Sequence, residues 1–102
     1  MDCKINWTNK AWKTYEANID YLKEALTQKE IINFILLVDR KILGLSKHPR
    51  IGISRNKKYP NIRSTVVHKR ILLIYKHKPV KNEIDLLIFW NTYRNPRKLK
   101  QG

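Results

Sequence analysis

Side chains able to carry out acid–base or metal chemistry are few in this sequence of 102 residues. Its three histidines, His48, His68 and His77, and its one cysteine, Cys3, fall in no metal-ligand spacing. We therefore expect neither a bound metal nor a cofactor. Histidine titrates in the range suited to general acid–base catalysis, but His68 stands beside Lys69 in a predicted turn, which favours plain exposure to solvent.

Cationic side chains dominate the sequence, with 22 lysines and arginines against 8 acidic residues and a net charge of +14. They are unevenly distributed. Residues 1–39 carry five basic and six acidic side chains, whereas residues 40–102 carry seventeen basic and two acidic ones. Because a one-sided positive field attracts polyanions, we expect nucleic acid, the ribosome or an acidic protein as a partner, rather than charge that serves solubility alone.

The basic residues predicted to contact nucleic acid fall in a polar loop, a hairpin turn and the C-terminal tail, where each could follow a phosphate backbone. They are Arg55, Lys57 and Lys58 in the loop, His68, Lys69 and Arg70 in the turn, and Arg97 and Lys98 in the tail.

A second domain, a membrane span and an export signal are not indicated. Residues 1–102 have the size and apolar content of one compact domain, with 42% hydrophobic residues. The apolar segments fall short of the roughly 18 residues that cross a bilayer, and the first residues contain no apolar run before a small-residue cleavage site. We expect a soluble, cytoplasmic protein that does not act at a membrane.

Two helices are predicted in the first half of the chain, after a short strand over residues 4–7. From residue 11 to residue 26, apolar side chains recur every three or four positions, which is the spacing of one helix stripe. Thr27 and Glu30 fit a capping box that starts a second stripe, and this stripe ends at His48-Pro49. Helices joined by so short a turn should form an antiparallel hairpin.

After Pro49 the apolar spacing becomes that of strands. Residues 51–53 lead into a polar stretch, 54–60, expected to be an exposed loop, and strands are predicted at 62–67, 71–75 and 84–90. The element order is thus β-α-α-β-β-β. We predict an α+β fold in which the N-terminal helical hairpin packs on one face of an antiparallel sheet. Three tryptophans lie on element faces and are expected in the core rather than on a base-stacking surface: Trp7, Trp12 and Trp90.

Four local patterns follow one another along the chain. They are Ile5-Asn6-Trp7-Thr8, Leu45-Ser46-Lys47-His48-Pro49-Arg50-Ile51-Gly52, Leu73-Ile74-Tyr75 and Phe89-Trp90-Asn91-Thr92-Tyr93-Arg94-Asn95-Pro96-Arg97-Lys98-Leu99. Together, in this order and in a chain this short, they resemble the RelE/ParE toxin superfamily over nearly the whole sequence. The resemblance implies a toxin that a co-expressed acidic antitoxin wraps and neutralises, and that stops growth when released.

Two targets are implied by the resemblance. RelE-like members enter the ribosomal A site and cut messenger RNA, whereas ParE-like members inhibit DNA gyrase without ribonuclease chemistry. The positive charge, together with the frequency of RNA cleavage among relatives, favours metal-independent cleavage of messenger RNA on the ribosome. Gyrase inhibition is the close alternative, and a protein that only binds its antitoxin is the third.

The resemblance also implies roles for particular residues. Arg63 falls where RelE carries a functional lysine and Arg94 near a functional arginine, so their guanidinium groups would hold the scissile phosphate. Each is equally well explained as a solvated strand-end residue or a local ion-pair partner. Tyr93 could stack on a base or transfer a proton, although a tyrosine after an apolar strand more often seals the edge of the core. The sequence departs from RelE at Thr65 and Leu72, where RelE carries further functional cations, and no tyrosine follows Arg94.

Overall fold

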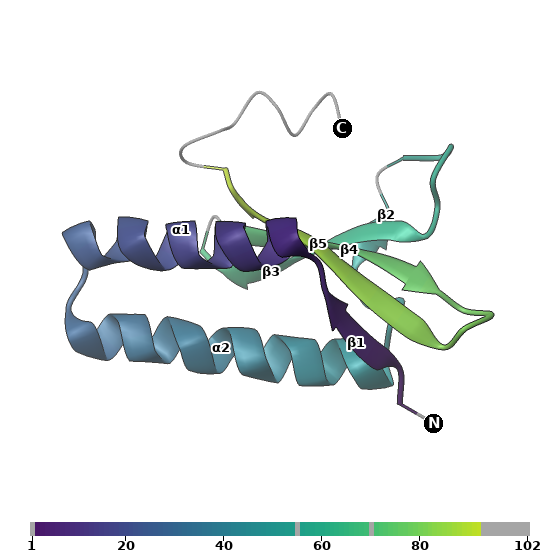
Figure 1. The fold of residues 1–102 in the computed structure, drawn as a ribbon, viewed down its shortest axis with the longest axis horizontal. Helices are drawn as coiled ribbons and strands as arrows, with labels where there is room; N and C mark the ends of the chain where they lie inside the picture. Colours follow the sequence, from purple (N-terminus) through teal and green to yellow (C-terminus); the bar gives the residue numbers. More distant parts are fainter. Residues whose placement is uncertain (1, 55, 70, 93–102) are drawn as a thin grey trace.

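The computed structural model describes residues 2–54, 56–69 and 71–92 (Figure 1). The elements are β1 (Lys4–Trp7), α1 (Asn9–Ala25), α2 (Gln28–Lys47), β2 (Ile53–Ser54), β3 (Ile62–His68), β4 (Ile71–Lys78) and β5 (Glu83–Asn91). The predicted α+β class and the predicted order of elements are confirmed, and β2 is an additional short strand. Within the described residues, no helix combines the length and apolar character needed to cross a membrane.

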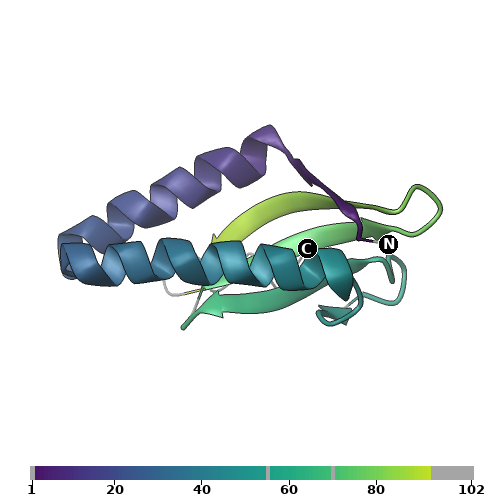
Figure 2. The same ribbon diagram turned by 90° about the horizontal axis from the view of Figure 1, so that it is seen from below.

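Each helix begins at a threonine that caps it. The Thr8 hydroxyl accepts a hydrogen bond from the Ala11 amide at 3.1 Å. Thr27 and Glu30 form the predicted capping box, in which the Thr27 hydroxyl accepts from the Glu30 amide at 3.3 Å and the Glu30 carboxylate accepts from the Thr27 amide at 3.5 Å. Only two residues separate the helices, so they form the expected hairpin, and they diverge from this turn toward β1 (Figure 2).

The strands form one sheet in the order β1-β5-β4-β3-β2. The pairs β2–β3, β3–β4 and β4–β5 are antiparallel, as predicted. The sheet differs from a wholly antiparallel one in a single pair, because β1 lies parallel to β5, from Lys4 opposite Glu83 to Trp7 opposite Leu86. This pairing joins segments almost 80 residues apart, and no local pattern specifies the direction of such a contact.

The region expected to be a loop from residue 54 begins instead with the edge strand β2. Ile53 lies opposite Ser64, and Ser54 lies opposite Arg63. Two strands are longer than predicted, because β4 continues through Lys78 and β5 starts at Glu83. The turn between β4 and β5 is therefore shorter than the predicted strand ends implied.

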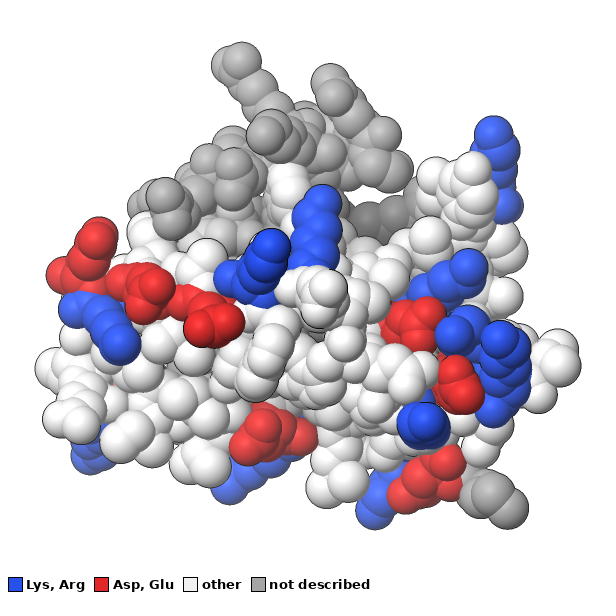
Figure 3. Space-filling view, in the orientation of Figure 1, with Lys and Arg blue, Asp and Glu red and all other residues white. Residues whose placement is uncertain are grey.

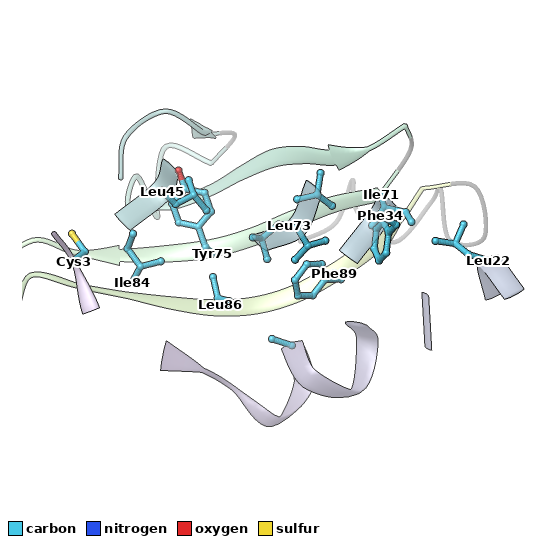
Figure 4. Close-up of a cluster of buried hydrophobic side chains, with 13 residues drawn as sticks. Cys3, Leu22, Phe34, Leu45, Ile71, Leu73, Tyr75, Ile84, Leu86 and Phe89 are labelled. Carbon is cyan, nitrogen blue, oxygen red and sulfur yellow. The ribbon is translucent and has the colours of Figure 1, made fainter. Parts of the chain in front are cut away.

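The core lies between the helices and one face of the sheet (Figures 2 and 4). Its sheet side is formed mainly by residues of the adjacent strands β4 and β5, and its helix side mainly by α2. The largest of its buried side chains are Leu73, Tyr75, Ile84, Leu86 and Phe89 from β4 and β5, and Phe34, Val38 and Leu45 from α2.

The prediction that all three tryptophans lie in the core is wrong for two of them. Trp7 is 37% exposed and Trp12 is 53% exposed, whereas Trp90 is half-buried. The Trp7 ring stacks on Phe89 at 5.6 Å, and the Trp12 ring lies nearly parallel to that of Tyr15 at 5.7 Å. Because α1 diverges from α2 at this end, Trp12, at the outer edge of the apolar stripe of α1, stays at the surface. Trp7 lies on β1, an edge strand of the sheet.

Candidate functional site

Arg63, the first candidate cation, is tied to the backbone segment that follows α2. It lies on β3 opposite Tyr75 of β4. Its Nη1 donates hydrogen bonds to the carbonyl oxygens of Gly52 at 2.8 Å and of Arg50 at 3.4 Å. Its Nε is buried and has no hydrogen-bond partner among the described residues. These contacts give Arg63 a structural role, and its part in RNA chemistry stays a prediction.

Tyr75 holds the same segment through its buried hydroxyl group. The hydroxyl accepts a hydrogen bond from the Gly52 amide at 2.9 Å and donates one to the Pro49 carbonyl at 2.8 Å. A Cβ on residue 52 would lie 2.5 Å from the Tyr75 Oη and 2.9 Å from the Ser64 carbonyl oxygen, so only glycine fits. Burial raises the pKa of the Tyr75 phenol, although the Gly52 hydrogen bond and the Arg63 charge oppose this. The hydroxyl therefore stays protonated and can donate.

This contact was not predicted, although the sequence contains a signal for it. Gly52 and Tyr75 both belong to the patterns that carry the superfamily resemblance, and the structure brings them together across 23 residues. Together with Arg63 they fix the chain between the end of α2 and β2. The polar loop that follows therefore starts from a rigid support.

Three of the cations predicted to contact nucleic acid are exposed on this framework. Lys57 and Lys58 lie in the loop between β2 and β3, and the Lys58 Nζ is 5.7 Å from the centre of the Tyr59 ring. Lys69 occupies the turn between β3 and β4 with a positive φ of 42°. Their exposure allows phosphate contacts, and nucleic-acid binding by these residues stays a prediction.

His68 is not the exposed turn residue that the sequence suggested. It is the last residue of β3 and is half-buried, with its ring edge-on to Phe34 at 5.5 Å. Burial lowers its pKa, the Lys69 charge lowers it further, and Glu30 opposes both. A neutral imidazole packed against α2 is better placed to support the core than to meet a nucleic acid.

Several of the predicted site residues lie outside the described residues. The prediction that the guanidinium groups of Arg63 and Arg94 hold the same phosphate therefore stays a prediction. They are Arg55, Arg70, Tyr93, Arg94, Arg97 and Lys98. The two positions that depart from RelE are described. Thr65 lies opposite Leu73, and Leu72 is buried between Val66 and Trp90 on the neighbouring strands.

Acidic residues are scarce in the basic half of the chain, and both of them are engaged. Glu83 and Asp85 lie 3.5 Å and 3.0 Å from the Lys78 ammonium group, and the Asn6 amide donates a hydrogen bond to each at 3.0 Å. The Asn6 hydrogen bond and Lys78 lower the pKa of Glu83. Figure 3 shows acidic groups among the lysines and arginines along α1 and beside β1. Residues 40–102 therefore have no other carboxylate side chain with which to balance their remaining cations.

Within the described residues, no group of three or more histidine, cysteine, aspartate or glutamate side chains could hold a metal ion. The framework is a helical hairpin on one face of a sheet, with a fixed segment leading from α2 to a basic loop.

The sequence matches no protein-family model and no curated protein. Its fold is similar to that of a solved structure described as "Chromosomal ParDE TA system from P. aeruginosa". The TM-score is 0.69 at 18% identity, over 87% of this chain and 95% of the other. This likeness confirms the fold that the resemblance implied.

Proposed function

We propose that the protein is the toxin of a toxin–antitoxin pair and is kept inactive by an acidic antitoxin. The observation that carries this proposal is the likeness of its fold, over 87% of the chain, to a structure of a ParDE system. The net charge of residues 40–102 supports it, because such a surface would bind nucleic acid indiscriminately if it were left uncovered.

We place the antitoxin on the sheet face opposite the helices, where Val66 is 52% exposed and Leu72 beside it is buried. Leu72 lies between Val66 and Trp90 on neighbouring strands, and Ile74 lies opposite Ile88. These residues alternate with those that face the helices, and none belongs to the main core cluster. An apolar face within the basic half of the chain suits a segment that combines apolar and acidic side chains.

Inhibition by binding, as in ParE-like gyrase inhibitors, is the mode of action that we favour. Cleavage of RNA needs groups that move protons beside the cations that hold phosphate. Near Arg63, the Tyr75 hydroxyl is engaged by backbone groups and the His77 imidazole is buried. Arg63 itself supports the backbone.

Ribosome-dependent cleavage of messenger RNA is the second candidate. It is favoured by the exposed cations of the loop between β2 and β3, Lys57 and Lys58. The catalytic set that this function would use is Arg63, Arg94 and Tyr93.

Inducible expression in bacteria tests the toxin role. Expression of the protein alone should arrest growth, and co-expression of the adjacent gene product should relieve the arrest. Normal growth with soluble, folded protein would contradict the proposal and would leave the third possibility, a relative that only binds its antitoxin.

The target is tested on the purified protein in two assays. Loss of gyrase-dependent DNA supercoiling with intact message supports the ParE-like mode. New 5′ ends inside translated codons, mapped by primer extension after cell-free translation, support cleavage instead. Arg63→Ala and Arg63→Lys are compared with Arg40→Gln, which changes an exposed cation on α2. Because Arg63 holds the backbone, unfolding of each variant is measured alongside its activity.

A further inference from the structure

A basic hollow lies at the C-terminal end of α2, apart from the loop and turn considered above. It is lined by Lys47, His48, Pro49, Arg50 and Ile51. Lys47 is the last residue of α2, and His48 caps the helix. The side chains of Lys47, His48 and Arg50 are exposed. Two cationic side chains and one imidazole thus surround one open depression.

Two further basic residues lie beside this hollow. The Arg63 guanidinium group donates to the Arg50 carbonyl oxygen at 3.4 Å. The His77 amide donates to the Asn61 carbonyl, two residues before Arg63, which places His77 and Arg63 on the same side of the β3–β4 pair. His77 is only 6% exposed. Burial, Arg50 and Arg63 lower its pKa, in that order of size, so both guanidinium charges act on this imidazole.

Part of this arrangement has an ordinary structural explanation. The C-terminal end of a helix is negative and favours nearby cations, which accounts for Lys47 and His48. Backbone hydrogen bonds account for Arg63. Neither explanation applies to Arg50, because its guanidinium group forms no ion pair or hydrogen bond with a described residue. The carboxylates of this half of the chain are held elsewhere by Lys78.

We infer that this hollow is a binding site for a phosphodiester group of a nucleic acid, with Arg50 as its main contact and Lys47 and His48 at its rim. A guanidinium group presents two parallel donors to phosphate oxygens and keeps its charge at any physiological pH. The bound anion would also offset the repulsion between the Arg50 and Arg63 guanidinium charges, both of which act on the His77 imidazole. This inference does not depend on the toxin role, because it concerns binding by the isolated protein.

Inorganic phosphate is the first probe, with the histidine ring signals followed by NMR at constant ionic strength. Phosphate should shift the His77 signals saturably and raise the pKa of His77, because a nearby anion stabilises the protonated imidazole. Arg50→Gln should abolish both effects, whereas Arg40→Gln, at an exposed position elsewhere on α2, should preserve them. Equal responses in Arg50→Gln and the unaltered protein, or no saturation in either, would overturn the inference.

Short DNA duplexes and single-stranded RNA form the second set of probes, and they distinguish the source of the phosphate. Loss of one contact should reduce the slope of log affinity against log salt concentration by about 0.9 for duplex DNA or about 0.7 for a single strand. Whichever nucleic acid shows this loss in Arg50→Gln, but not in Arg40→Gln, is the ligand of the hollow. Unchanged slopes for both nucleic acids would overturn the inference, as would a loss confined to binding of polyglutamate, which would assign the hollow to an acidic protein.

Stability measurements separate binding from a structural role. Arg50 and Arg63 both act on the His77 imidazole, and Arg50 has no carboxylate partner among the described residues, so removal of its charge should leave the urea midpoint of Arg50→Gln unchanged or slightly higher. Weakened nucleic-acid binding at an unchanged midpoint supports the inference. Weakened binding with a lowered midpoint, when Lys47→Gln retains full binding, would instead mark Arg50 as a support of the fold and overturn it.

Discussion

Tyr75→Phe removes one oxygen atom from the contact that fixes the segment after α2, and its effect on stability can be worked out from the structure. The hydroxyl makes two hydrogen bonds, to the Gly52 amide at 2.9 Å and the Pro49 carbonyl at 2.8 Å. Gly52 is buried, so its amide would lose its partner, whereas Pro49 is partly exposed and can bond to water. A typical hydrogen bond contributes about 1 kcal/mol, and an unsatisfied buried group costs about 1–3 kcal/mol. We expect a total loss of about 2–4 kcal/mol in the free energy of unfolding.

Urea unfolding monitored by circular dichroism measures this loss. In thermal unfolding, the midpoint should fall by about 4–8 °C for each kcal/mol lost in a domain of this size. Tyr59→Phe is the matched control, because the Tyr59 side chain is 51% exposed and should change stability by less than about 0.5 kcal/mol. Equal stability of Tyr75→Phe and Tyr59→Phe would refute the argument that the buried hydroxyl fixes this segment.

Four further variants test this contact and other parts of the fold. Gly52→Ala should destabilise the protein by more than about 1 kcal/mol in urea unfolding, since its Cβ would meet the Tyr75 hydroxyl, and wild-type stability would show that this contact yields easily. Thr27→Ala should cost about 0.5–2 kcal/mol through loss of the α2 cap, and Thr27→Ser should restore most of it; equal losses in both variants would contradict the capping argument. In the folded state, burial and then the Lys69 charge lower the pKa of His68, so protonation of this imidazole favours unfolding. The stability that the neutral imidazole contributes is complete above the unfolded pKa of about 6.5 and is lost as the pH falls below it. His68→Gln should therefore flatten the decline of the urea midpoint between neutral and mildly acidic pH, and an unchanged decline would assign that acid sensitivity to other groups.

Local patterns were sufficient to predict most of the elements. The capping box at Thr27 and Glu30 and the apolar spacing of α1 and α2 act within one or two helical turns, so they can be read directly from the sequence. The strands β3, β4 and β5 were predicted from short apolar runs, with errors of one to three residues at their ends. The uneven distribution of charge also required no structure.

The site residues were less predictable, because their roles depend on neighbours that are distant in the sequence. Arg63 could be recognised as a cation on a strand, but only the fold brings it to the carbonyl oxygens of Gly52 and Arg50. His68 was placed in the turn, yet a register shift after Val66 leaves it facing Phe34 of α2. The packing of the folded chain thus gives structural roles to Arg63 and His68, which were expected at the surface.

Composition and spacing by themselves determined the class of fold, the order of its elements and the position of the basic half, because these follow from backbone preference, apolar period and charge. Tertiary structure decided which of the cations remain free to bind. It set β1 parallel to β5, where Glu83 and Asp85 meet Asn6 and Lys78, and it left Arg50 with no carboxylate among the described residues. The physical reason is that the action of a charged side chain depends on its nearest partners, and these are chosen by contacts that span almost the entire described chain.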